Sequence, residues 1–111
     1  MEVTESRIGS ATTLKIVGRV DSSVAKALEQ KVLDVASRDG HIVVDLGGMN
    51  YVSSAGLRSF IILAKQARAK NKAIALAGMS DEVAEIFDIS GLLELFAIYD
   101  SVEAAVAALP R

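Results

Sequence analysis

The 111-residue chain has no cysteine, one histidine (His41) and one proline (Pro110). The absence of cysteine excludes a disulfide framework, a thiol nucleophile and a thiolate metal site. One histidine cannot build a multi-histidine metal site, and a Ser-His-Asp triad would depend on His41 with no G-x-S-x-G motif to support it. We therefore interpret His41, which begins an expected strand, as a structural or surface residue, and we expect no metal site.

Phosphate-binding loops are missing as well, since neither G-x-x-x-x-G-K-[ST] nor G-x-G-x-x-G occurs. The formal charge is −2 with no basic run, which argues against direct nucleic-acid binding. No apolar stretch is long enough to cross a bilayer, and the N-terminus shows no secretory pattern. We expect a cytoplasmic protein without membrane insertion, enzyme activity or a cofactor.

Apolar residues make up 51% of the chain, and the length is typical of a single domain, here residues 1–111. Strands are expected over residues 12–17, 41–46, 73–77 and 95–99, each followed by a helix. This alternation across short loops predicts an α/β fold with a mostly parallel sheet of about four to five strands and about four helices. Residues 3–9 predict a hairpin strand at one edge of the sheet.

Local signals mark the turns and the helix starts. Gly47-Gly48 is interpreted as a turn, and the hydroxyls of Ser22 and Ser23 are expected to cap the first helix. A second helix is predicted to begin within the segment Ser53-Ser54-Ala55-Gly56. Its buried stripe, at helical spacing, is predicted to consist of Leu57, Phe60, Ile61, Ala64 and Ala67.

Two adjacent serines stand at the start of the second helix. A serine there is most simply an N-cap, whose hydroxyl accepts from an otherwise unpaired amide. Only one of Ser53 and Ser54 can have this role, so the other is spare. Arg58 falls in the first turn, where a cation opposes the helix dipole, which suggests that it faces an anion or an acidic partner.

The carboxyl ends of the parallel strands are the expected place for function. Three turns, over residues 18–22, 47–54 and 78–81, should lie together at that end and form one surface. The partner-binding residues predicted on this surface are Asp21, Ser22, Ser53, Ser54, Ala55, Gly56, Leu57, Arg58, Ser80 and Asp81.

Three motifs in order resemble those of STAS domains, in the anti-sigma-factor antagonist branch. GRVD at residues 18–21 is similar to the first turn of that family, and DLGGMNYVSSAGLRSF is similar to its central strand and phosphoacceptor loop. MSDEVAEIFDISGL at residues 79–92 looks like its third segment, in which a helix ends in F-x-x-S-G-L. The resemblance covers nearly the whole chain and implies the STAS fold.

The resemblance also implies partner switching. Such antagonists bind an anti-sigma factor that is also a serine kinase; phosphorylation of one serine separates the pair, and a serine phosphatase resets it. The loop in the family often reads D-S-[ST]-G-L, which assigns the phosphoacceptor to Ser54. Ser53 replaces the usual aspartate and is a second possible acceptor, and Asp21 matches the acidic residue of the neighbouring turn.

Two other functions stay open at this point. The chain could be an unphosphorylated STAS docking subunit of a transport or signalling complex, with Ser54 as a helix cap or contact residue. It could also be a small-molecule or nucleotide sensor that uses the surface at the strand ends.

Overall fold

The computed structural model describes residues 1–38 and 40–110. Within these residues, five strands and four helices follow one another, with a short 3₁₀ turn (Leu93–Leu95) before the last strand. The elements are β1 (Glu2–Ile8), β2 (Ala11–Val20), α1 (Ala25–Ser37), β3 (His41–Val52), α2 (Ser54–Ala69), β4 (Ile74–Ala77), α3 (Asp81–Ile89), β5 (Ala97–Tyr99) and α4 (Val102–Ala108).

The strands form one sheet in the order β1-β2-β3-β4-β5. β1 pairs antiparallel with β2, and every other neighbouring pair is parallel. This arrangement confirms the predicted α/β fold with a mostly parallel sheet and an N-terminal hairpin at its edge.

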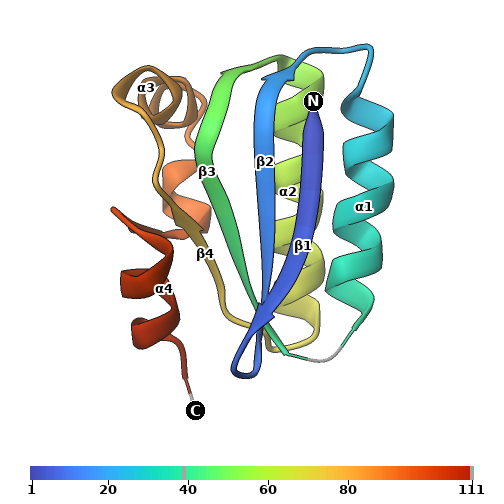
Figure 1. The fold of residues 1–111 in the computed structure, drawn as a ribbon. Helices are drawn as coiled ribbons and strands as arrows, with labels where there is room; N and C mark the ends of the chain where they lie inside the picture. Colours follow the sequence, from blue (N-terminus) through green and yellow to red (C-terminus); the bar gives the residue numbers. More distant parts are fainter. Residues whose placement is uncertain (39, 111) are drawn as a thin grey trace.

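Helices cover the two faces of the sheet unequally (Figure 1). The main core lies between the sheet and helices α1, α2 and α3, with Leu28, Phe60 and Phe87 fully buried in it. On the other face, α4 packs Ala105 against Val43 of β3 and two alanines of β4. β3 is therefore covered on both sides, as its nearly continuous apolar run indicated.

The interpretation of Gly47-Gly48 as a turn is wrong, because both glycines lie inside β3, which continues to Val52. A Cβ atom on Gly48 would lie 2.9 Å from Cγ2 of Val17 on β2. The pairing of β2 and β3 also shifts register between Lys15 and Val17. Glycine is needed here because the neighbouring strand approaches closely, not because the chain turns.

Three other expectations need correction. Neither Ser22 nor Ser23 caps α1: its N-cap is Val24, with no side-chain bond, and the Ser23 hydroxyl donates to Asp21 instead. The strand expected over residues 95–99 is shorter, because Leu95 ends the 3₁₀ turn. Ile61 is only partly buried, and Leu63 takes its place in the buried stripe of α2.

An ion-pair cluster fastens β1 to α1. A carboxylate oxygen of Glu5 lies 3.0 Å from Lys31 Nζ and 2.6 Å from Arg38 Nη2. Arg38 also contacts Asp34 at 3.2 Å. The hydrogen bond from Arg38, followed by that from Lys31, lowers the pKa of Glu5 from 4.5 to about 2. The cluster therefore favours the folded state wherever Glu5 is ionised.

We expect Glu5→Gln to lower the free energy of unfolding by about 1 kcal/mol at pH 7, as for a partly exposed ion-pair network. Because the folded pKa is depressed, this stabilisation is present above pH 4.5 and is lost as the pH falls toward 2. Urea denaturation of both proteins across this range measures it. Glu2→Gln removes a carboxylate from the same strand and is the control. A constant difference between wild type and Glu5→Gln down to pH 2 would contradict the assignment.

Candidate functional site

The two serines at the start of α2 have different roles. Ser53 is the N-cap: its Oγ accepts from the Gly56 N–H at 3.1 Å, and its carbonyl accepts from the Leu57 N–H at 2.8 Å. Ser54 is the first residue of the helix and is exposed. Within the described part of the chain, its hydroxyl makes no hydrogen bond that holds the fold together. Ser54 is therefore the spare serine.

The first turn of α2 is pressed against the ends of two strands. A Cβ atom on the buried Gly56 would lie 2.8 Å from Cγ1 of Val20 and 2.9 Å from Cγ2 of Val52. The Ser53 N–H donates to the Val20 carbonyl at 2.8 Å, which ties the end of β2 to the start of the helix. This packing fixes the backbone that presents Ser54. Of the predicted contact residues, Gly56 is thus a packing residue.

The turn after β2 lies beside the first turn of α2. A shallow cavity of about 240 Å³ is lined by Ser22, Ala55 and Arg58, together with Ala25, Lys26 and Glu29 of α1. The adjacent Asp21 carboxylate accepts from the Ser23 hydroxyl and, at 3.0 Å, from the Ser23 N–H. These bonds lower the pKa of Asp21, so this turn carries a negative charge at neutral pH.

The third predicted turn has a different local role. Ser80 is the N-cap of α3, and its Oγ accepts from the Val83 N–H at 3.2 Å. Asp81 is the first residue of that helix and is exposed. Both side chains lie near the carboxyl end of β4, as expected, but neither lines the groove that contains Ser54.

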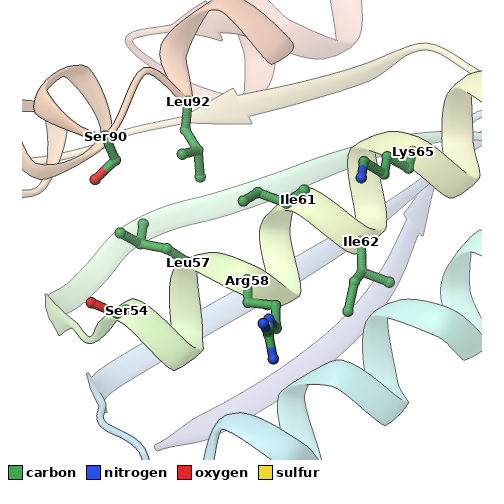
Figure 2. Close-up of a pocket in the computed structure, with 8 residues that line it drawn as sticks. All are labelled: Ser54, Leu57, Arg58, Ile61, Ile62, Lys65, Ser90 and Leu92. Carbon is green, nitrogen blue, oxygen red and sulfur yellow. The ribbon is translucent and has the colours of Figure 1, made fainter.

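A groove of about 510 Å³ runs along α2 from Ser54 to Lys65 (Figure 2). One wall belongs to α2 and the other to the segment that follows α3. The side chains that line it are those of Ser54, Leu57, Arg58, Ile61, Ile62, Lys65, Ser90 and Leu92. Ser54 therefore lies at one end of an apolar groove that also carries two cations.

Most of this groove escaped prediction from the sequence, which indicated only Ser54, Leu57 and Arg58. A usable signal was present in the four consecutive apolar residues Phe60 to Leu63. Four successive side chains spread over about 300° of a helix, so they cannot all face one core. Phe60 and Leu63 are buried, which leaves Ile61 and Ile62 partly exposed in the groove.

His41 has a structural role, since its Nδ1 accepts from the Ala73 N–H at 2.9 Å. Among the described residues, no group of three or more His, Cys, Asp or Glu side chains could hold a metal ion. In the same part of the chain, no helix has both the length and the apolar character needed to span a membrane.

Comparison with known proteins identifies the family to which the chain is similar. The model of the STAS domain family matches residues 3–105. BtrV of Bordetella bronchiseptica, a protein named as an anti-sigma factor antagonist, is 37% identical, and the alignment covers 100% of both chains.

Solved structures share the fold. An anti-sigma factor antagonist from Mycobacterium paratuberculosis superposes with a TM-score of 0.89 at 19% identity, covering 97% of this chain and 92% of that one. SpoIIAA of Bacillus in its phosphorylated form gives a TM-score of 0.74 at 14% identity, covering 96% of this chain and 97% of that one.

Substitution of each serine by alanine tests the division of roles between them. Ser53→Ala removes the cap and should lower the free energy of unfolding by about 1 kcal/mol. Ser54→Ala removes a hydroxyl without a structural partner and should leave that free energy within about 0.5 kcal/mol of wild type. Urea denaturation measures both. Equal losses in the two variants would mean that Ser53 is not the dominant cap.

Proposed function

Because the chain belongs to the STAS domain family and to its anti-sigma factor antagonists, we propose that it binds an anti-sigma factor and is released when Ser54 is phosphorylated. It acts in the cytoplasm as a binding module of one domain over residues 1–111, without catalysing a reaction. The anti-sigma factor is also the serine kinase, and a separate serine phosphatase restores the unmodified form.

The observation that carries the proposal is the free hydroxyl of Ser54 on a rigid support. Ser53 supplies the cap through its bond to the Gly56 N–H, so modification of Ser54 removes no bond that the fold needs. The same bond argues against Ser53 as the acceptor, because a phosphate there would have to displace the cap.

The kinase step transfers the γ-phosphoryl group of ATP to Ser54 Oγ. A new O–P bond forms, the bond from phosphorus to ADP breaks, and the hydroxyl proton passes to a base of the kinase. The phosphatase hydrolyses the ester with water and returns serine and inorganic phosphate. The present chain is the substrate in both reactions.

Electrostatics explain why this modification would separate the pair. A phosphate adds a charge of about −1.5 to −2. The start of α2 tolerates it, because helix N-termini favour anions. At the centre of an interface, however, it must lose its water and meet any acidic groups of the partner. A loss of about 2.7 kcal/mol is enough to weaken binding about a hundredfold.

The proposed contact surface centres on the exposed side chains around Ser54. Ala55 and Arg58 of α2 and Ser22 of the neighbouring turn line one cavity, which supports their assignment to a common interface. Asp21 adds a negative charge beside them. Ser80 and Asp81, at the start of α3, would extend the interface away from the groove, while Gly56 and the largely buried Leu57 support it from beneath.

Binding of Ser54 variants to the purified cognate anti-sigma factor tests the proposal. Calorimetry should give similar dissociation constants for wild type and Ser54→Ala, and a constant at least about tenfold higher for Ser54→Asp, because the carboxylate imitates part of the phosphate charge. With ATP present, mass spectrometry should detect one phosphate on wild type and on Ser53→Ala, and none on Ser54→Ala.

If all three proteins bind equally and no phosphate is added, the proposed release by phosphorylation of Ser54 is wrong. That result would instead favour the reading in which the chain is a docking subunit of a larger complex.

A further inference from the structure

Helix α2 carries apolar side chains on two faces. One face packs Phe60 and Leu63 into the core, whereas Ile61 and Ile62 stay partly exposed in the groove. Leu92, from the segment after α3, lies across from Ile61, whereas Ile62 points to the other side of α2 (Figure 2). Clustered apolar side chains on an otherwise polar helix face are typical of a surface that another protein covers.

Two cations accompany this apolar surface. Arg58, Ile61, Ile62 and Lys65 follow the i, i+3, i+4, i+7 spacing, so they share one face of α2. None of the described residues that line the groove is acidic. Within the described part of the chain, Arg58 forms no ion pair. Glu29 of α1 lines the neighbouring cavity with Arg58, but Lys26 lies there as well and Arg58 pairs with no acid among the described residues. The groove therefore presents an apolar strip with two cations along it.

We propose that this groove docks an amphipathic helix of the anti-sigma factor that carries acidic residues. Its apolar stripe would cover Ile61, Ile62 and Leu92, and its carboxylates, about two turns apart, would face Arg58 and Lys65. The inference rests on the proposed function and identifies which part of the partner binds.

The dimensions of the groove suit a helix. Ser54 and Lys65 are eleven residues apart on α2, which corresponds to about 16 Å, or three helical turns. Grooves that bind helices are filled by apolar anchors at the spacing of successive turns, and two cations seven residues apart match acids on one face of the bound helix. Charge complementarity therefore selects an acidic helix over a basic one.

The same groove explains how the phosphate acts. Arg58 lies four residues after Ser54, one helical turn away, and both side chains line the groove. Arg58 and Lys65 contribute a charge of +2, and a phosphate on Ser54 would contribute about −1.5 to −2. Phosphorylation would thus cancel nearly all of the positive charge that attracts the acidic helix. It would also supply Arg58 with a competing anion on its own chain.

Charge reversal in the groove tests the inference. Arg58→Glu and Lys65→Glu should each raise the dissociation constant for the purified anti-sigma factor by about tenfold or more, with a smaller effect at high salt. Lys15→Glu, the same charge change on the opposite face of the sheet, should stay within about twofold of wild type. Urea denaturation of each variant verifies that it is folded.

A photo-crosslinking residue in place of Ile62 identifies the occupant. Mass spectrometry of the crosslinked peptide should locate it in a helix of the anti-sigma factor with at least two acidic residues on one face. Substitution of one of those acids by lysine should restore binding to Arg58→Glu or Lys65→Glu.

The outcomes separate the two proposals. If wild type does not bind the anti-sigma factor at all, both the proposed function and the inference about the groove are wrong. If wild type binds and the groove variants bind equally well, only the groove inference is overturned. If the crosslink joins two copies of this chain and sedimentation shows a dimer that Arg58→Glu dissociates, the occupant is a second copy and the inference is wrong.

Discussion

The close packing of Gly56 between Val20 and Val52 is the constraint on which the candidate site depends. There is no room for a Cβ atom at this position, so the first turn of α2 rests directly on the ends of β2 and β3. That contact fixes the direction in which α2 leaves the sheet. With that direction, Ser53 caps the helix, Ser54 is exposed, and Ile61 packs only at the margin of the core. A larger residue at 56 would alter all three together.

The site combines a rigid backbone with exposed side chains that make few interactions within the protein. The backbone around Ser54 is held by the hydrogen bond from the Ser53 N–H to the Val20 carbonyl and by the Ser53 cap. A modification of the Ser54 hydroxyl breaks neither bond and should leave the fold unchanged. The side chains that face outward, above all Arg58, have few interactions of their own. A partner or a phosphate can therefore compete for them without changing the fold, and the proposed switch needs only local electrostatics.

Local patterns in the sequence predicted the elements well because alternation and helical spacing are properties of short segments. The hairpin strand, the mostly parallel sheet and the start of α2 all followed from them. Gly47-Gly48 was misleading, because the residue that crowds Gly48 is Val17, which lies on another strand. The choice between Ser53 and Ser54 as cap stayed open, and the prediction of Ile61 in the buried stripe of α2 was wrong, because Leu63 is buried there instead. Both depend on the angle at which α2 meets the sheet, which is a tertiary property that no local pattern encodes.

The ion-pair cluster of Glu5 has a consequence for how the protein can evolve. Arg38 lies just past the end of α1, whereas Ser54 lies where β3 gives way to α2, at the opposite end of the sheet (Figure 1). Substitutions at Glu5 or Arg38 would change how much of the chain is folded, and so its abundance in the cell, without touching the surface that a partner reads. The residues that set the amount of folded protein are thus different from those that a partner would contact, so selection can act on either set while the other is preserved.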